Sequence, residues 1–310
     1  MCYNSESMSR FLLIVVDYCN SEPPTGVAGK YINPRSMITD CMKRLIHGEA
    51  LAEMSKMDEN SIDLTVTSPP YDATRTAYKQ QSLDELVAVY TQLLHITTNG
   101  GVFCLNIRDG WVKGAYTGTT FRLVVALLDV GWKLHTDIIS SKDGRPGAWF
   151  NKRFKIDHEY VFNFVKGDEP QYFNKEPLKI PAKWAGAKYH GTQRKSDGEL
   201  DPIVGDYTIK AMKCRGTVWP YRVGGGQDDS LGHQHPAIMP KNLARDLIMC
   251  FSEPGMTVLD PMAGSGTTLL QARNLGRDYL GIEINKDYYD LIVERLGQPT
   301  SDHKDVQKRW

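Results

Sequence analysis

The feature that most constrains this chain is an apolar strand that ends in a glycine-bearing turn and leads directly into a helix. After Val258-Leu259 the 310-residue sequence reads Asp260-Pro261-Met262-Ala263-Gly264-Ser265-Gly266-Thr267-Thr268. Glycines at such a turn let a ligand approach the backbone without meeting a Cβ atom. Glu283 follows 17 residues beyond Gly266, at the end of the next expected strand, where a carboxylate can hold a ribose diol. The segment therefore predicts a unit of a parallel α/β sheet with a ribose-bearing ligand at its turn, in preference to a tight turn that binds nothing.

The same alternation of strands and helices recurs along most of the sequence. Strands are expected at about 61–66, 102–107, 132–140, 158–165, 256–259 and 279–284. Helices are expected from a capping box at Ser82 to a stop at Asn99-Gly100-Gly101, and at about 119–129, 240–251, 266–275 and 286–296. This alternation predicts an α/β fold, with a doubly wound, mainly parallel, Rossmann-like sheet covered by helices on both faces.

Charge divides the chain into regions. The net charge is zero, but residues 142–222 carry 16 Lys and Arg against 10 Asp and Glu and hold 13 of the 30 aromatic residues. Because phosphates attract cations and aromatic rings stack on bases, we expect this segment to face DNA, with Lys152, Arg153 and Lys155 as contacts. The alternative is a solvated surface over a small core. The predicted organisation is an N-terminal arm at 1–36, two halves of one sheet domain at 37–141 and 223–297, a target-recognition region at 142–222 between them, and a polar tail at 298–310.

The segment Ser68-Pro69-Pro70-Tyr71 follows the first expected strand and suits a reaction at an amino group on an aromatic ring. The exocyclic amine of cytosine or adenine is a poor nucleophile, because its lone pair is delocalised into the ring. The Ser68 hydroxyl, and carbonyls that the two prolines hold stiffly, can accept hydrogen bonds from that amine. Tyr71 can stack on a base that has left the duplex. Taken alone, the segment could also be a proline turn that ends a strand.

The residues of the glycine turn limit which ligands it can bind. The turn lacks the third glycine of the dinucleotide fingerprint and the Gly-Lys-Ser/Thr of a phosphate loop. Asp260 would repel a pyrophosphate, but it could serve the sulfonium or ammonium cation of S-adenosylmethionine. An NAD-dependent oxidoreductase is therefore a disfavoured alternative.

Together and in this order, the two segments resemble the beta class of DNA amino-methyltransferases over about residues 40–297. Other matching segments run from His158 to Phe164, from His235 to Pro240 and from Gly281 to Asn285. The resemblance implies DNA as a partner, S-adenosylmethionine as cofactor, no metal, and a catalytic segment formed by Ser68, Pro69, Pro70 and Tyr71, with Glu49 as catalytic support near the target amine. It implies a cofactor site made of Asp260, Pro261, Ala263, Gly264, Ser265, Gly266, Thr267, Thr268, Glu283, Ile284, His235 and Pro236.

The first residue of the catalytic segment bears on the target base. In this class Ser is typical of N4-cytosine methylation, whereas Asp or Asn is typical of N6-adenine methylation. Ser68 thus predicts a site-specific DNA methyltransferase that acts on the N4 amine of a flipped-out cytosine. The alternatives are an N6-adenine enzyme and a catalytically silent DNA-binding relative. The resemblance also leaves room for a companion restriction endonuclease.

The sequence lacks the residues that other catalytic chemistries require. None of the 16 prolines is followed by cysteine, the pair common in cytosine C5 methylation. The six cysteines do not have the spacing of a metal site. The sequence also lacks the Gly-x-Ser-x-Gly segment that would indicate a catalytic triad. The early apolar run from Phe11 to Val16 is too short to span a bilayer. We therefore expect a cytoplasmic, DNA-associated protein without a membrane segment.

Overall fold

The computed structural model describes residues 44–70, 81–143, 152–189, 191–202, 207–222, 235 and 237–297. All of these residues belong to one compact unit. The predicted arm at 1–36 and the predicted tail at 298–310 lie outside the described residues.

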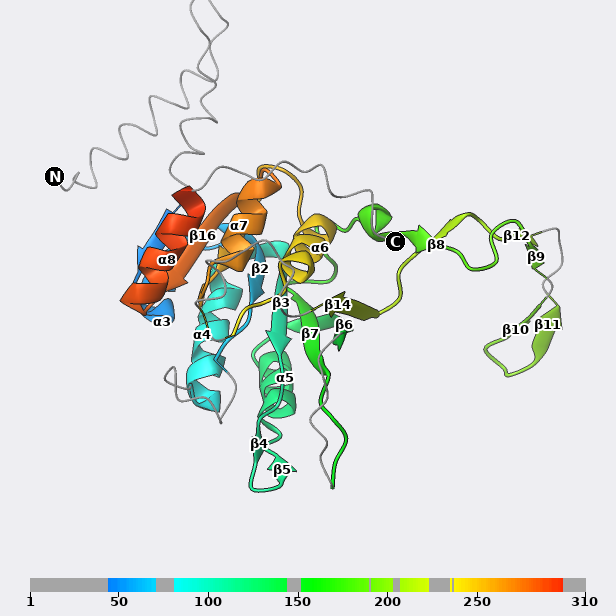
Figure 1. Cartoon of the computed structure of the whole chain (residues 1–310), viewed down its shortest axis with the longest axis horizontal. Helices are drawn as coiled ribbons and strands as arrows, with labels where there is room; N and C mark the ends of the chain where they lie inside the picture. Colours follow the sequence, from blue (N-terminus) through cyan, green and yellow to red (C-terminus); the bar gives the residue numbers. More distant parts are fainter. Residues whose placement is uncertain are drawn as a thin grey trace, which may run out of the picture. The chain divides into compact units, whose positions relative to one another are not determined.

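The centre of the fold is an eight-stranded sheet (Figure 1). Its strand order is β1 (Arg44–His47), β16 (Asp278–Glu283), β15 (Thr257–Asp260), β2 (Ile62–Thr67), β3 (Thr97–Ile107), β7 (His158–Val165), β6 (Lys133–Asp143) and β14 (Val218–Arg222). Neighbouring strands are parallel except at β7, which runs antiparallel to both β3 and β6. The expected mainly parallel α/β sheet is therefore confirmed.

Helices cover both faces of this sheet because its strands are apolar on both sides. Along β3, Phe103 and Leu105 belong to one buried cluster, while Val102 and Cys104 belong to the other. The first cluster includes residues of α3 (Ala50–Met54), α4 (Leu83–Ile96) and α5 (Thr119–Asp129). The second includes residues of α6 (Lys241–Phe251), α7 (Thr267–Asn274) and α8 (Lys286–Gly297). Successive strand residues point to opposite faces, so each strand contributes to both cores.

Helix α4 shows where the sequence pattern succeeds and where it misses. The predicted capping box is present: Glu85 N donates to Ser82 Oγ at 3.2 Å, and Ser82 N donates to Glu85 Oε2 at 2.7 Å. The predicted stop at Asn99 is wrong, because extended backbone begins at Thr97. Thr97 donates through both its backbone N–H and its hydroxyl to Leu93 O, which ends the helix without a glycine. Strand β3 consequently starts five residues before the expected Val102.

The segment predicted as a recognition region, residues 142–222, contributes to the central sheet at both ends. β7 lies between β3 and β6, and β14 pairs in parallel with β6 at the sheet edge. Three short antiparallel pairs lie between these two strands: β8 (Ile180–Pro181) with β13 (Met212–Lys213), β9 (Lys188–Tyr189) with β12 (Tyr207–Thr208), and β10 (Thr192–Arg194) with β11 (Leu200–Pro202). We call this nested set the ribbon. The 3₁₀ helix η1 (Glu176–Leu178) precedes it, and a separate hairpin joins β4 (Trp111–Val112) to β5 (Ala115–Tyr116).

A buried ionic cluster fixes the chain that follows the ribbon to helix α6. Arg215 Nη1 lies 3.1 Å from Asp246 Oδ2, and the Tyr221 hydroxyl donates to the same oxygen at 2.8 Å. The Arg215 and Asp246 side chains are 5% and 2% exposed, respectively. The Arg215 guanidinium also lies over the ring of Trp219, 4.8 Å from its centroid. Burial raises the pKa of Tyr221, so its phenol stays a hydrogen-bond donor to Asp246.

Candidate active site

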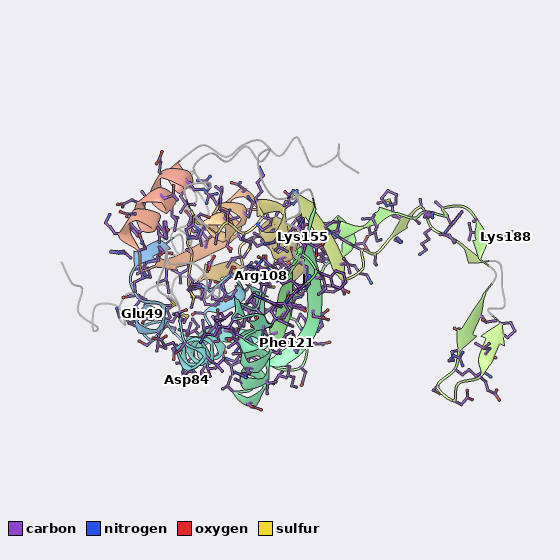
Figure 2. All side chains as sticks on the ribbon, turned by 60° about the horizontal axis from the view of Figure 1, so that its bottom comes forward. Glu49, Asp84, Arg108, Phe121, Lys155 and Lys188 are labelled. Atoms are coloured by element: carbon purple, nitrogen blue, oxygen red, sulfur yellow. The ribbon has the colours of Figure 1, made fainter. Side chains whose placement is uncertain are left out.

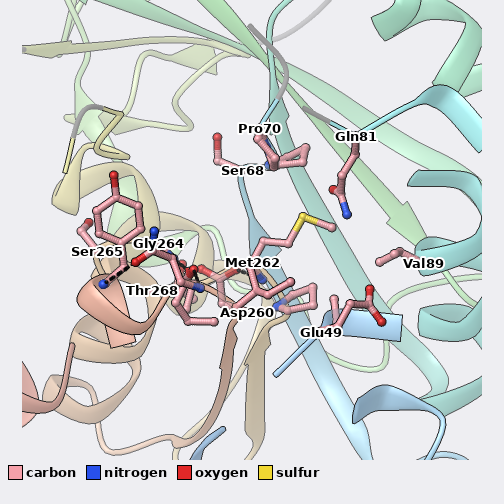
Figure 3. Close-up of a pocket in the computed structure, with 18 of the residues that line it drawn as sticks. Glu49, Ser68, Pro70, Gln81, Val89, Asp260, Met262, Gly264, Ser265 and Thr268 are labelled. Atoms are coloured by element: carbon pink, nitrogen blue, oxygen red, sulfur yellow. Dashed lines mark hydrogen bonds between the residues drawn. The ribbon is translucent and has the colours of Figure 1, made fainter. Parts of the chain in front are cut away.

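A cavity of about 520 Å³ opens where strands β2, β15 and β16 end at the carboxyl edge of the sheet (Figure 3). In α/β folds ligands bind at this edge, because the strand-to-helix loops converge there. Of the predicted site residues, the cavity is lined by Glu49, Ser68, Pro69, Pro70, His235, Asp260, Pro261, Ala263, Gly264, Ser265, Thr267, Thr268, Glu283 and Ile284. The structure thus brings Ser68, Pro69 and Pro70 of the predicted catalytic segment to the same site as the glycine turn. Tyr71 and Pro236 lie outside the described residues.

The glycine turn is held by the acid that follows it in sequence. Gly264 N donates to Glu283 Oε2 at 2.7 Å, and Asn285 N donates to Glu283 Oε1 at 2.8 Å. Burial raises the pKa of the Glu283 carboxyl, while these backbone donors act in the opposite direction. Each carboxylate oxygen has a second lone pair, so Glu283 can support the turn and still accept hydrogen bonds from a ligand.

The two glycines of the turn have different roles. Both adopt left-handed backbone, with φ of +53° at Gly264 and +74° at Gly266. A Cβ atom at Gly264 would lie 3.2 Å from Nε2 of His235, which lines the cavity. A Cβ atom at Gly266 would instead lie 2.9 Å from Cγ1 and Cγ2 of Ile292 on α8, and Gly266 is not among the residues that line the cavity. The need for glycine at position 266 thus comes from packing against α8 and from φ.

Asp260 is a buried carboxyl in the lining of the cavity. Its side chain is 4% exposed, and its Oδ1 accepts hydrogen bonds from the Thr67 hydroxyl at 2.7 Å and from Met262 N at 3.2 Å. Burial raises the pKa of Asp260 to about 6, and the hydrogen bonds from Thr67 and Met262 limit that rise. The carboxyl is therefore mostly ionised at pH 7, and it presents a buried negative charge to whatever occupies the cavity.

The predicted catalytic segment is positioned by the end of strand β2. Ser68, Pro69 and Pro70 follow Thr67, the last residue of that strand, and line the cavity (Figure 3). The Thr268 hydroxyl donates to Val66 O at 3.0 Å, which ties the start of α7 to the same strand end. The two segments, separated by almost 200 residues, are thus joined by direct hydrogen bonds at the cavity floor.

Two other predicted residues have structural contacts that the sequence did not reveal. Glu49 is the N-cap of α3: its carboxylate accepts hydrogen bonds from Leu51 N at 3.0 Å and from Ala52 N at 2.7 Å. The His235 ring packs edge-on against Tyr288 with centroids 4.4 Å apart, and its Nδ1 lies 2.8 Å from Ala237 O. Glu49 lines the cavity while it caps a helix, so its support of the reaction stays a prediction.

Sequence reasoning missed one wall of the cavity. This wall comes from the start of α3, from α4 and from the chain just before each of these helices: Gly48, Ala50, Leu51, Gln81, Glu85, Ala88 and Val89. Ala237, Met239, Met262, Asn285 and Tyr288 complete the lining that was not predicted. Gln81 presents a buried side-chain oxygen without a hydrogen-bond partner among the described residues (Figure 3). The only signal available in the sequence was its place immediately before the capping box, since helix starts often border such crevices.

The three predicted DNA contacts are not among the residues that line the cavity. Lys152, Arg153 and Lys155 lie on the chain that leads into β7, and the Arg153 guanidinium stacks over Trp111 of β4, 4.8 Å from the ring centroid. Phe154 between them is 96% exposed. Figure 2 shows Lys155 near the start of β7 and Lys188 on strand β9 of the ribbon.

Within the described part of the chain, no group of three or more His, Cys, Asp or Glu side chains is placed to hold a metal ion. No described helix is long and apolar enough to span a membrane.

The fold is that of the DNA methyltransferases. It matches the solved structure of the PvuII DNA methyltransferase (cytosine-N4-specific) with a TM-score of 0.63 and 19% identity, covering 84% of this chain and 89% of that one. It also matches the structure of TTHA0409, a putative DNA modification methylase from Thermus thermophilus, complexed with S-adenosyl-L-methionine. That match has a TM-score of 0.55 and 24% identity, and it covers 81% of this chain and 92% of the other.

Residues 62–294 match the family model described as DNA methylase, the N6_N4_Mtase family. The chain is 36% identical to the orphan methyltransferase M.BamHII of Bacillus amyloliquefaciens, covering 80% of this chain and 93% of that protein. It is 27% identical to the DNA adenine methyltransferase YhdJ of Escherichia coli (strain K12), covering 82% of each chain. The protein belongs to the DNA methylase family, whose members methylate amino groups of DNA bases, N4 of cytosine or N6 of adenine.

Proposed function

We propose that the protein transfers a methyl group from S-adenosylmethionine to the N4 amine of cytosine in DNA. The observation that carries this proposal is that Ser68-Pro69-Pro70 line a single cavity together with Glu283 and most residues of the turn Asp260–Thr268. A methyl donor and a flipped-out base must meet in one site, and these two segments supply acceptors suited to each.

The residues present fit S-adenosylmethionine. Asp260 offers a buried carboxylate for a cationic group, Glu283 offers acceptors for a ribose diol, and the glycine turn brings backbone to the cavity surface. The cavity is walled in part by Pro261, Met262 and Ile284, which suits the flat face of an adenine ring. When bound, S-adenosylmethionine supplies an electrophilic methyl group, and the amine that accepts it loses one proton.

The catalytic segment activates the amine by accepting its hydrogen bonds. The Ser68 hydroxyl and the adjoining proline-linked carbonyls favour the pyramidal nitrogen that has a free lone pair. No covalent bond to the enzyme is needed, since the nitrogen attacks the methyl group directly. The base must leave the duplex to reach the cavity, and Tyr71 is the predicted stacking partner.

Two elements support contact with the DNA phosphates and grooves. One is the cationic group Lys152, Arg153 and Lys155 that precedes β7. The other is the ribbon, a two-stranded antiparallel element of a width that the DNA major groove admits. The ribbon carries Lys188 and Arg194 on its strands and an exposed Trp184 beneath Lys183, whose Nζ lies 5.1 Å from the ring centroid. A companion restriction endonuclease stays a prediction.

The choice between cytosine and adenine depends on Ser68. A serine in this position favours cytosine, and an adenine-specific relative such as YhdJ keeps N6-adenine as the second candidate. The deciding experiment incubates the protein with unmethylated mixed-sequence DNA and S-adenosylmethionine, followed by mass spectrometry of the released nucleosides. N4-methylcytosine is the expected product. If N6-methyladenine were the only product, the assignment to cytosine would be wrong. If no methylated base were found, the protein would not be an active methyltransferase.

The Ser68→Ala variant tests the role of the segment. We expect its turnover number to fall by about 10²-fold, because one positioned acceptor is lost, while the affinity for S-adenosylmethionine stays within about twofold. Ser61→Ala serves as a matched control, since Ser61 lies at the other end of the same strand and its hydroxyl donates locally to Asp58 O. Full activity of Ser68→Ala would show that the segment is not catalytic.

A further inference from the structure

Thr67 is a buried residue that contacts the cavity only through another side chain. It is fully buried, it is not among the residues that line the cavity, and its hydroxyl donates to Asp260 Oδ1 at 2.7 Å. Asp260 does line the cavity. The hydroxyl of Thr67 therefore reaches the cavity through the carboxylate of Asp260, its hydrogen-bond partner.

We propose that Thr67 is a positioning residue for the cofactor: its hydroxyl holds the Asp260 carboxylate in place for the cationic end of the methyl donor. This inference rests on the proposed function, because it takes S-adenosylmethionine as the ligand. It adds a role for the last residue of β2, which neither lines the cavity nor forms part of the predicted catalytic segment.

The pairing of β2 with β15 explains the contact. The two strands are parallel, with Leu64 opposite Val258 and Thr65 opposite Leu259, so the ends of the strands at Thr67 and Asp260 are brought side by side. Oδ1 of Asp260 accepts from Thr67 on one strand and from Met262 N on the turn. With two donors on one oxygen, the carboxylate rotamer is set by both the strand end and the turn.

The charges around Asp260 give this contact a measurable consequence. Burial raises the pKa of Asp260 to about 6, and Glu283 on β16 adds to that rise. The hydrogen bonds from Thr67 and Met262 lower it. Tyr90 on α4 also interacts with Asp260, but burial raises the pKa of this phenol well above its ordinary value, so Tyr90 stays neutral. Removal of the Thr67 hydroxyl therefore shifts Asp260 toward its protonated form near neutral pH, which is the form that cannot pair with a cation.

The test compares Thr67→Val with a matched control on the same strand. Thr65 is also fully buried, but its hydroxyl has no hydrogen-bond partner among the described residues, so Thr65→Val makes the same chemical change without removing a bond. Thr67→Ser keeps the donor. Calorimetry measures the dissociation constant of S-adenosylmethionine for each protein at pH 6.5 and pH 8.5.

A shift of about one pH unit at Asp260 predicts a specific pattern. Thr67→Val should bind more weakly than wild type at both pH values, because the carboxylate is no longer held in place, and its loss of affinity should be about threefold larger at pH 6.5 than at pH 8.5. Thr65→Val and Thr67→Ser should match wild type at both pH values. A loss of affinity in Thr67→Val that is the same at both pH values would indicate a purely structural role and overturn the inference, as would unchanged affinity at pH 6.5.

A second measurement needs no cofactor. Carbon-13 NMR of aspartate-labelled protein, with Asp260 assigned through Asp260→Asn, follows the titration of this carboxyl directly. We expect its midpoint to rise in Thr67→Val and to stay unchanged in Thr65→Val, and an unchanged midpoint in Thr67→Val would overturn the inference. If Thr67→Val does not fold, Thr67→Ala removes the same hydroxyl. Failure of the wild-type protein to bind S-adenosylmethionine would count against the proposed function, whereas normal binding with an unshifted midpoint would count against Thr67 alone.

Discussion

Three glycines with left-handed backbone lie around helix α7. Alanine substitutions at these positions separate two causes of lost stability, backbone strain and steric overpacking. Gly276 (φ +72°) has nothing within 4 Å of an added Cβ, Gly264 (φ +53°) would meet His235, and Gly266 (φ +74°) would meet Ile292. An alanine at each position carries the left-handed backbone penalty of about 1–2 kcal/mol. At Gly266 the added methyl also lies 2.9 Å from two carbons of Ile292, which is fully buried, so overpacking adds about 1–3 kcal/mol.

We therefore expect Gly276→Ala to lower the free energy of unfolding by about 1–2 kcal/mol and Gly266→Ala to lower it by about 2–5 kcal/mol. Gly264→Ala should resemble Gly276→Ala in stability but weaken binding of S-adenosylmethionine, because its methyl group displaces the cavity residue His235. Urea unfolding curves measure the stabilities and calorimetry measures the binding. If Gly266→Ala were no less stable than Gly276→Ala, the reasoning from the Ile292 contact would be refuted.

Asp260→Asn should raise the free energy of unfolding of the unliganded protein at pH 7.5 by about 1–3 kcal/mol. A buried carboxyl whose pKa is raised to about 6 destabilises the folded protein when it is ionised, above that pKa. In the wild-type protein this destabilisation should disappear as the pH falls through 6 toward 4. The same variant should bind S-adenosylmethionine more weakly. The stability measured by urea unfolding should therefore rise while the affinity measured by calorimetry falls. Replacement of Lys152, Arg153 and Lys155 together by alanine should weaken DNA binding at low salt and reduce the slope of log K against log salt by about 1 for each lost phosphate contact, as measured by fluorescence anisotropy over a salt series. An unchanged slope would move the DNA contact to other cations, such as those of the ribbon.

The predictions that held depend on short stretches of sequence. The capping box at Ser82, the α7 turn and the apolar strands leave local patterns, because hydrogen-bonding side chains, glycines and alternating burial act within a few residues. The convergence of Ser68 and Asp260 also followed from the sequence, since both come after strands expected to be parallel. Parallel strands place their carboxyl ends at the same edge of a sheet.

Two strands that the sequence did not predict, β1 and β14, each depend on a partner strand that is distant in sequence. β1 is only four residues long and half-exposed, so it shows little pattern, and it becomes a strand by pairing with β16. β14 contains Pro220, which reads as a break, but a proline is tolerated on this edge strand. The recognition region therefore shares both of its ends with the central sheet.

The sequence by itself determined the fold class and predicted the chemistry at the cavity, because the residue types that can hold a sulfonium cofactor or an aromatic amine occur in contiguous segments. Tertiary structure alone decided how those residues are supported. In the folded protein Gly266 packs closely against Ile292, and Glu49 caps helix α3. The Thr67 hydroxyl donates a hydrogen bond to Asp260, which lies 193 residues away in sequence. Such contacts arise where separate strands and helices pack together, and no local pattern records which side chain will lie opposite which.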